Sequence, residues 1–237
     1  MSNDLIAIVT GGGSGIGRAI AAALAPSCSK ILLVGRRPET LAETARALLA
    51  TAPETAVDEV IADLSTEAGV ATVIDRALDC ERVDVVVNNA AHMTVAPIEE
   101  MTSDLLCETF TTNVHGPALL VAGLWPLFER QGAACIVNVS SMATLDPFPG
   151  LAAYAMSKAA LESLTRSIVA ERGDTDIRAF SLVLGAVETE MLRRVVSKED
   201  LPPSQTLSPT DVARVVVECV AGERDDERGQ PISVNHG

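Results

Sequence analysis

The sequence predicts an α/β fold, a single doubly wound domain in which a seven-stranded parallel sheet has helices on both faces. Seven short runs are rich in β-branched residues and apolar almost throughout, which is typical of strands that are buried on both faces. Longer amphipathic or alanine-rich stretches separate these runs, and strands that alternate with helices indicate a parallel sheet. The chain has 237 residues, of which 48% are hydrophobic and 21% are charged, and this composition can bury the core of one domain, 1–237.

The expected elements follow one another along the chain without an internal repeat or a linker. The strands are LIAIV (5–9), ILLV (31–34), VDEVIA (57–62), VDVVV (83–87), ACIVNV (134–139), IRAFSLVL (177–184) and PISV (231–234). The helices cover 16–25, 38–50, 67–79, 104–128, 154–172 and 209–222. We expect Thr210 to be the N-cap of the last helix, after Pro209. Residues 189–208 lack clear periodicity and predict a loop or short substrate lid.

Composition excludes several classes of function. The formal net charge of −14 argues against nucleic acid as a partner, because phosphate backbones are bound by surplus Lys and Arg. No stretch approaches the roughly 20 consecutive apolar residues that span a bilayer, and the first residues lack a signal-peptide pattern, so we expect a cytoplasmic protein without membrane contact. The five cysteines include no C-x-x-C pair and predict reduced, packed thiols. The three histidines are far apart, and we expect no metal site.

A glycine-rich run, TGGGSGIG at residues 10–17, joins the first expected strand to the first expected helix. Backbone N–H groups of such a turn and of the helix N-terminus face one point in space, which suits a phosphate. A P-loop is excluded because Arg18 and Ala19 stand where its lysine and hydroxyl residue belong. The pattern G-x-G-x-x-G also fails, because Ser14 and Ile16 occupy glycine positions. The remaining spacing, G-x-x-x-G-x-G, fits a phosphate-binding turn or a tight turn that only packs a helix on a strand.

That spacing, preceded by a threonine, resembles the first turn of the short-chain dehydrogenase/reductase family. Further motifs occur in the family's order and spacing: NNAA (88–91), Asn113, VNVSS (137–141) and YAMSK (154–158). The resemblance extends from Leu5 to the C-terminal region and so covers essentially the whole chain. It implies a Rossmann-type domain and, within the family, the 3-oxoacyl-reductase-like subgroup.

Tyr154 and Lys158 form a Y-x-x-x-K pair, a spacing that places both side chains on one face of a helix. A phenol with a pKa of about 10 is a poor acid or base at neutral pH, and an adjacent ammonium lowers that pKa. Tyr154 would then exchange a proton with the substrate oxygen while hydride moves to or from nicotinamide. An isolated pair of this kind is also compatible with a surface tyrosine beside a solvated lysine.

The resemblance adds two catalytic positions. The family's serine stands thirteen residues before the tyrosine, which selects Ser141 as the ligand of the substrate oxygen. Ser140 is then expected to satisfy backbone groups at the strand end. Asn113 matches the family's helix asparagine, which implies that it holds a water linking the lysine to solvent. An amide in this helix can instead make a purely structural hydrogen bond.

The choice of cofactor depends on GRRPE, residues 35–39. In relatives that use NAD, the residue at the end of the second strand is commonly acidic and binds both ribose hydroxyls. Here Gly35 stands at that place, and Arg36 and Arg37 follow it. A guanidinium suits a 2′-phosphate, so the sequence predicts NADP(H) in preference to NAD(H), with Arg36 as the main phosphate ligand and Ser14 as a second. Two solvated arginines that open the next helix are the alternative.

The resemblance implies a cofactor site built from the glycine run and the ends of several strands. The expected cofactor-binding residues are Gly11, Gly13, Ser14, Gly15, Ile16, Gly17, Arg36, Arg37, Asp63, Leu64, Asn89, Ala90, Tyr154, Lys158, Val187 and Thr189. Among them, Asp63 is expected against the adenine ring. The expected substrate wall is largely apolar and comprises Met93, Thr94, Met142, Leu145, Leu151, Met191 and Leu192.

These features predict an oxidoreductase that transfers a hydride between NADP(H) and a carbonyl or secondary alcohol, with Tyr154 as general acid and base. Two residues depart from the family's patterns. Ala91 replaces a glycine and would be strained only at positive φ, and Leu184 replaces a proline, which predicts a more mobile loop beside the nicotinamide. These departures leave open a non-catalytic cofactor-binding sensor or scaffold. A methyltransferase of the same architecture would explain neither Tyr154 nor Lys158.

Self-association is a further implication of the resemblance. Relatives pair the helices that correspond to residues 105–128 and 153–170 with their symmetry mates, and alanine-rich faces allow such close approach. We therefore expect a homodimer or homotetramer with closed symmetry. The alternative is that these faces pack only on the sheet of their own chain.

Overall fold

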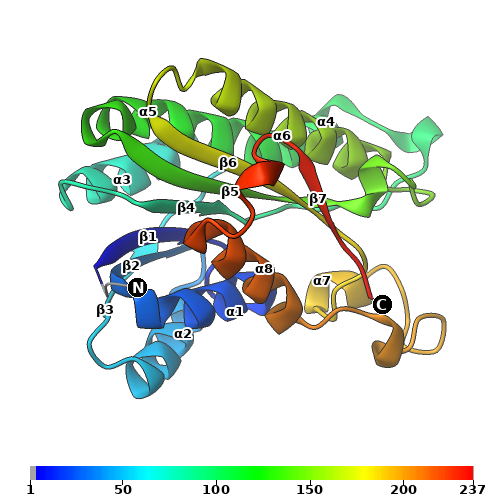
Figure 1. Cartoon of the computed structure of the whole chain (residues 1–237). Coiled ribbons are helices and arrows are strands. Elements are labelled where there is room, and N and C mark those ends of the chain that lie inside the picture. Colours follow the sequence, from blue (N-terminus) through cyan, green and yellow to red (C-terminus); the bar gives the residue numbers. More distant parts are fainter. Residues whose placement is uncertain (1–3, 237) are drawn as a thin grey trace.

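A computed structural model describes residues 4–236, so residues 1–3 and 237 of the expected domain lie outside the described residues. Its centre is a sheet of seven strands in the order β3-β2-β1-β4-β5-β6-β7, and every neighbouring pair is parallel (Figure 1). The strands are β1 (Leu5–Thr10), β2 (Cys28–Gly35), β3 (Ala56–Ile61), β4 (Val85–Asn88), β5 (Ala133–Ser141), β6 (Asp176–Leu184) and β7 (Pro231–Val234). The predicted α/β fold with a seven-stranded parallel sheet is confirmed.

Helices cover both faces of the sheet, as Figure 1 shows. One face carries α1 (Gly15–Leu24), α2 (Pro38–Thr51) and α8 (Pro209–Ala221), and the other carries α3 (Glu67–Leu78), α5 (Gly116–Gln131) and α6 (Ala152–Glu171). Strand β1 contributes to both cores, because Ala7 and Val9 pack on the first face and Ile8 on the second. Burial on both faces explains why these strands are apolar throughout. Within residues 4–236, no helix is long and apolar enough to cross a bilayer.

The order of the strands places a crevice between β1 and β4. The chain leaves β1 toward β2 on one side, whereas β4 is followed by β5 on the other side. In open parallel sheets, ligands bind at such a switch point, outside the carboxyl ends of the strands. The glycine turn after β1 and the segment after β4 both begin at this edge.

The stretch predicted as one helix over 104–128 is interrupted. It comprises α4 (Ser103–Phe110), a π-helical turn (Thr111–His115) and α5. Pro117 gives a physical reason for the interruption: it has no N–H to donate to the carbonyl of Asn113, four residues earlier. The π-helical turn contains Asn113 with its side chain fully buried.

The last helix begins one residue after Ser208, and Thr210 is not its N-cap. Ser208 Oγ accepts from the backbone N–H of Asp211 at 3.2 Å, and the Asp211 carboxylate accepts from the backbone N–H of Ser208 at 2.8 Å. This capping box satisfies two groups at once and leaves Pro209 in the first turn, where no N–H is needed. The Thr210 prediction was therefore wrong by two residues.

The segment 189–208, expected to be a loop or short lid, has regular structure of its own. It contains the short helix α7 (Glu190–Arg193) and a 3₁₀ turn over Pro203–Gln205. Its end returns to the sheet edge, because Leu207 N–H donates to the Ala186 carbonyl at 2.8 Å and Glu188 N–H donates to the Leu207 carbonyl at 2.8 Å. These bonds hold the backbone after β6 although Leu184 replaces the proline of the family pattern.

The five cysteines are all unpaired, as expected from their spacing. Cys28, Cys135 and Cys219 are buried, and burial raises the pKa of each thiol, in the first two to about 12. They therefore pack as small apolar groups. Cys80 is half-buried and packs against the core of the second face, whereas Cys107 is exposed.

Candidate active site

A cleft of about 540 Å³ lies at the carboxyl ends of β1, β4, β5 and β6. The glycine turn after β1 forms one end of it, and the first turns of α6 approach from the side of β5. The segment after β6 supplies a largely apolar wall from Met191, Leu192, Val195, Val196 and Leu201. The cleft therefore joins the candidate cofactor turn to the candidate catalytic residues.

Thr10 ties the glycine turn to the end of β4. Its side chain is buried; Oγ1 donates to the Val87 carbonyl at 3.0 Å and accepts from the backbone N–H groups of Asn89 at 2.9 Å and Ala90 at 3.0 Å. Asn89 Nδ2 returns a bond to the Thr10 carbonyl at 2.8 Å. The two strand ends that border the cleft are thus fastened by one hydroxyl.

The glycine turn has the conformation that its composition predicts. Gly11 and Gly15 have φ of +67° and +50°, values that other residues rarely adopt. A Cβ on Gly17 would lie 2.2 Å from the Gly11 carbonyl oxygen, so only glycine lets α1 pack so closely on its own turn. Ser14 is the N-cap of α1, makes no capping hydrogen bond with its side chain and lines the cleft. The free hydroxyl and the helix N-terminus provide donors that fit a dinucleotide phosphate.

Arg18, which stands where a P-loop has its lysine, braces the turn. Its Nη2 donates to the Gly13 carbonyl at 2.8 Å and its Nε to Thr44 Oγ1 at 3.0 Å, on helix α2. The guanidinium is occupied by these groups and does not line the cleft. This use of Arg18 is consistent with the exclusion of a P-loop.

The two arginines of the GRRPE stretch lie at the end of β2, outside the lining of the cleft. Arg36 Nη1 lies 3.7 Å from Asp63 Oδ2, and the two side chains are 68% and 41% exposed. Burial opposes ionisation of Asp63, but hydrogen bonds from Ser65 and the charge of Arg36 outweigh it and lower the pKa of the carboxyl. Gly12 N–H donates to the Val34 carbonyl at 3.1 Å and so ties the glycine turn to the same strand.

Helix α6 and the end of β5 bring the candidate catalytic residues together. Tyr154 and Lys158 lie one turn apart, and Lys158 Nζ is 5.6 Å from the centre of the tyrosine ring. The lysine is 1% exposed, and Nζ donates to the Val139 carbonyl at 2.7 Å. Burial lowers the pKa of Lys158 to about 8. This lysine is therefore not the solvated surface residue of the alternative interpretation.

The pKa of the Tyr154 phenol differs from the expectation. Burial raises its pKa to about 12, and the Ser141 hydroxyl opposes this only in part. We expected the neighbouring ammonium to lower the pKa, but Lys158 Nζ donates to the Val139 carbonyl and lies 5.6 Å from the centre of the tyrosine ring. Desolvation is the largest effect on the pKa of the phenol, which is therefore protonated at neutral pH.

Asn113 is anchored by protein groups. Its Oδ1 accepts from the backbone N–H of His92 at 2.7 Å, and its Nδ2 donates to the His92 carbonyl and to Ser157 Oγ, both at 2.9 Å. The side chain therefore makes the structural bonds of the alternative interpretation. Because Pro117 has no N–H, the backbone carbonyl of Asn113 lacks its α-helical donor. These bonds do not test whether Asn113 holds a water, so the water relay stays a prediction.

Ser140 has a partner that the sequence did not indicate. Its Oγ donates to Glu162 Oε1 on α6 at 2.6 Å and lies 3.5 Å from the Lys158 carbonyl oxygen. The expected role in satisfying backbone groups is therefore the minor one. The short bond joins the end of β5 to the helix that carries Tyr154 and Lys158.

Comparison with known proteins identifies the family. A family model described as short chain dehydrogenase matches residues 5–200. The chain belongs to the short-chain dehydrogenase family. Levodione reductase of Leifsonia aquatica is 31% identical over 199 residues, which cover 83% of this chain and 74% of that protein.

Solved structures of short-chain dehydrogenases share the whole fold. One such family protein is 30% identical, with a TM-score of 0.87, and the match covers 99% of this chain and 97% of the other. A second, assigned as an NAD(P)-dependent gluconate 5-dehydrogenase from Beutenbergia cavernae and containing NADP at low occupancy, is 30% identical, with a TM-score of 0.88 and coverage of 98% and 95%. These likenesses extend over both ends of the cleft.

Most residues predicted from the short-chain dehydrogenase motifs meet at the cleft. Those that line it are Gly11, Ser14, Gly15, Ile16, Asn89, Ala90, Ser141, Tyr154, Lys158, Val187 and Thr189. Those outside its lining are Gly13, Gly17, Arg36, Arg37, Asp63, Leu64 and Asn113. The reasons differ: the glycines allow close packing, the side chain of Leu64 is buried in the core, and the charged residues lie at the ends of β2 and β3.

The expected substrate wall is partly different. Met93, Met142, Leu151, Met191 and Leu192 line the cleft as predicted, whereas Thr94 and Leu145 do not. Thr94 Oγ1 instead lies 2.9 Å from His92 Nε2, and Leu145 is 64% exposed. Sequence reasoning missed the side chains that enter from residues 143–148 and 195–201, because neither segment has a periodic pattern.

The departure at Ala91 causes no backbone strain. Among residues 4–236, Glu81 is the one residue other than glycine with a positive φ. Ala91 therefore adopts a conformation that any residue can adopt, and it lines the cleft next to Ala90. Thr10, whose hydroxyl ties the glycine turn to the end of β4, was not predicted as a site residue, although its position directly before the first glycine was a signal.

Proposed function

We propose that this chain is a nicotinamide-dependent reductase or dehydrogenase that acts on a carbonyl or secondary alcohol and prefers NADP(H), with cofactor binding and catalysis in one domain. The observation that carries the proposal is the convergence of Ser141, Tyr154 and Lys158 in the cleft that begins at the glycine turn. Bound nicotinamide would supply or accept the hydride. The levodione reductase relative supports a carbonyl compound as substrate.

The side chains of the cleft divide the remaining work. Tyr154 carries its proton at neutral pH and would donate it to the carbonyl oxygen as hydride transfer makes that oxygen basic, and it would regain a proton in the next cycle. Ser141, whose hydroxyl acts to lower the pKa of the phenol, would hold the same substrate oxygen. Lys158, held by the Val139 carbonyl, supplies positive charge beside the phenol and a donor toward the cofactor ribose. Asn113 anchors the segment after β4 against α6 through His92 and Ser157.

Preference for NADP(H) is proposed from the end of β2. Gly35 offers no carboxylate to the ribose hydroxyls, and the mostly exposed Arg36 follows directly after it at the end of β2. Its ion pair with Asp63 is long and exposed, so a phosphate can replace the carboxylate at little cost. Ser14 contributes a second donor at the N-terminus of α1. The NADP bound to the Beutenbergia cavernae structure supports this choice.

The proposal includes a homodimer or homotetramer in the cytoplasm. Leu119 on α5 and Met156 on α6 are large apolar side chains that stay 45% and 44% exposed on the isolated chain. They lie on the helices that the family resemblance assigns to contacts between subunits.

The proposed location in the cytoplasm is supported by the cysteines. All five are unpaired, which is in keeping with a reducing compartment.

The test compares wild type with Tyr154→Phe in assays of NADPH oxidation against a panel of ketones. We expect turnover by the wild type and a loss of about two to four decades in the variant, because proton transfer by a positioned side chain contributes that much. The affinity for NADPH, measured by fluorescence titration, should change little. A variant that retains most of the wild-type rate contradicts the catalytic role of Tyr154.

Two neighbouring serines provide a matched comparison. Ser141→Ala removes the hydroxyl that lines the cleft with the phenol, whereas Ser140→Ala removes one bonded to Glu162, and the first should cost much more turnover than the second. A different outcome is a wild-type protein that binds NADPH and yet neither reduces the ketones nor oxidises the corresponding alcohols. That result favours the alternative of a cofactor-binding sensor or scaffold.

A further inference from the structure

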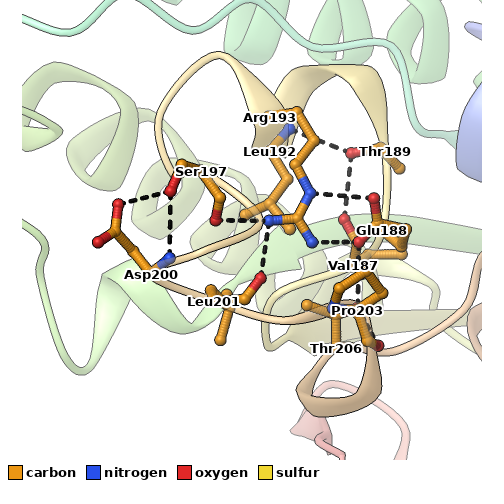
Figure 2. A network of polar contacts seen from close by, with 10 residues as sticks. All are labelled: Val187, Glu188, Thr189, Leu192, Arg193, Ser197, Asp200, Leu201, Pro203 and Thr206. Carbon is orange, nitrogen blue, oxygen red and sulfur yellow. Dashed lines mark hydrogen bonds and ion pairs between the residues drawn. The ribbon is translucent and has the colours of Figure 1, made fainter.

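One guanidinium lies at the centre of the segment that walls the cleft. Arg193 Nε donates to Glu188 Oε1 at 3.0 Å, and Nη2 donates to the second oxygen of the same carboxylate (Figure 2). Nη1 donates to two backbone carbonyls, those of Ser197 at 3.0 Å and Leu201 at 2.8 Å. The side chain of Arg193 is 15% exposed. A single side chain thus joins three separate pieces of backbone.

Each of these pieces contributes side chains to the cleft. Glu188 stands between Val187 and Thr189, which line its cofactor end. Leu201 gives its carbonyl to Arg193 and its side chain to the cleft. Leu192, directly before Arg193, lines the cleft as well, whereas Arg193 does not. The guanidinium therefore braces the wall without touching the cleft.

Other bonds extend the network to the end of the segment. Thr206 Oγ1 lies 3.4 Å from Glu188 Oε2 and donates to the Pro203 carbonyl at 2.9 Å, as Figure 2 shows. Ser197 Oγ donates to Asp200 Oδ2 at 2.7 Å and accepts from the Asp200 backbone N–H at 3.1 Å. With Arg193 in place, residues 188–206 form one hydrogen-bonded unit.

The next residue offers a natural contrast. Arg194 Nη2 lies 2.8 Å from Glu190 Oε1, but the two side chains are 70% and 71% exposed. The pair bridges only one turn of the same helix. Exposed pairs of that kind contribute little. Two adjacent arginines, each bonded to a glutamate, therefore differ in what they hold together.

We propose that Arg193 is the positioning residue for the cofactor and substrate wall: its bonds to Glu188, Ser197 and Leu201 fix residues 187–201 in the arrangement that forms the cleft. This inference rests on the proposed function and deepens it. The role requires arginine, because a planar fork donates to a carboxylate on one side and to two carbonyls on the other, which the compact ammonium of lysine cannot reproduce. Loss of the fork removes both of its bonds to the Glu188 carboxylate and leaves the Leu201 carbonyl without its donor, whereas the Ser197 carbonyl keeps the backbone N–H of Leu201 at 3.1 Å.

The experiment compares Arg193→Lys and Arg193→Met with the control Arg194→Met. Hydrogen exchange of the backbone amides in 189–206 is measured on the protein without ligand, where the amides report local opening. We expect both Arg193 variants to exchange at least about tenfold faster there, with β4 and β5 unchanged and the control equal to wild type. Exchange in Arg193→Met that matches the control overturns the proposal.

Kinetics provide a second readout. In the Arg193 variants, KM for the carbonyl substrate and the Kd of NADPH should rise by about tenfold, with a smaller change in kcat, because the wall positions ligands and takes no part in proton transfer. The charge exchange Glu188→Arg with Arg193→Glu restores an ion pair but no donor to the two carbonyls, so it should not restore KM. Full rescue by the exchange contradicts the role of the carbonyl bonds.

The two readouts separate this inference from the proposed function. In one outcome, the Arg193 variants exchange faster but the wild type neither binds NADPH nor reduces ketones. That outcome supports the structural role of Arg193 and refutes the proposed function, together with the predicted changes in KM and Kd. A wild type that turns over, with Arg193 variants equal to Arg194→Met in both exchange and KM, supports the proposed function and refutes the inference.

Discussion

Tyr154 and Lys158 show how burial sets the acid and base properties of two side chains one helical turn apart. Desolvation disfavours the charged form of each, so it raises the pKa of the phenol to about 12 and lowers that of the lysine to about 8. The hydrogen bond to the Val139 carbonyl, at 2.7 Å, does not cancel this effect. The phenol therefore carries its proton at neutral pH, whereas the pKa of the lysine lies close to neutral pH.

The low pKa of Lys158 predicts how stability depends on pH. The unfolded chain keeps this proton up to the ordinary value of 10.5, whereas the folded chain releases it at about 8. Between these values the unfolded state binds more protons, so the contribution of Lys158 to the free energy of unfolding rises with pH. From pH 7 to pH 9, wild type should gain about 1 kcal/mol relative to Lys158→Met in urea unfolding. A difference that does not change with pH contradicts the shift.

Arg36 is the residue that should distinguish the two cofactors. Loss of a charge-assisted contact to a 2′-phosphate costs on the order of 1.5–3 kcal/mol, or about one to two decades in affinity. Arg36→Ala should therefore weaken binding of NADPH far more than of NADH, as measured by titration. Arg37→Ala is the matched control and should have the smaller effect. Equal losses for both cofactors, or a wild type that prefers NADH, contradict the assignment.

At the scale of elements, β1, the glycine turn and α1 form a unit whose geometry depends on missing side chains. The turn is tied to β4 through Thr10 and to α2 through Arg18. Helix α1 approaches so closely that a Cβ on Gly17 would also lie 2.6 Å from Asn89 Nδ2. The same closeness directs the helix N-terminus into the cleft.

Gly17→Ala should therefore damage stability and ligand binding together. The added methyl group has to displace the backbone of Gly11, and overpacking of this kind typically costs about 1–3 kcal/mol. NADPH affinity should fall by at least about tenfold, since the turn that holds the phosphate shifts. Gly132→Ala is the comparison: φ there is +77° and no atom lies within 4 Å, so strain lowers stability but leaves NADPH affinity unchanged. Unchanged NADPH affinity in Gly17→Ala contradicts the argument.

For the whole molecule, two cores on opposite faces hold one sheet, and the cleft lies at the edge where the strand order reverses. Helices α5 and α6 cover the outer side of one core. Their exposed apolar residues, Leu119 and Met156, have no partner in the sheet of their own chain. The strand order therefore explains the cleft, and the exposed helix faces motivate the proposed assembly.

Light scattering at micromolar concentration should give the mass of two or four chains. The double variant Leu119→Arg with Met156→Arg places charges on both helix faces and should shift the mass toward one chain, because charged groups are depleted from interface cores. The exposed Leu49→Arg on α2 is the control and should keep the wild-type mass. A wild type with the mass of a single chain contradicts self-association.

Much of the fold could be predicted because it depends on short-range patterns. The runs that became β2 and β6 are apolar over nearly every residue, and the glycine spacing at Gly11, Gly15 and Gly17 reflects steric limits that act within one turn. The Y-x-x-x-K spacing likewise placed two side chains on one helix face. Helix boundaries were less certain, as the cap at Ser208 and the π-helical turn at Asn113 show, because both depend on competing hydrogen bonds.

By itself, the sequence determined the α/β architecture, the family and most of the motif residues that line the cleft, since periodicity and motif spacing are local properties of the chain. Only the tertiary structure decided how those residues behave. The pKa of Tyr154 depends on its burial in the folded chain, the bond from Ser140 to Glu162 joins residues 22 positions apart, and the fork of Arg193 requires a folded backbone around it. Such contacts and the loss of water that accompanies them arise from packing, which no local pattern records.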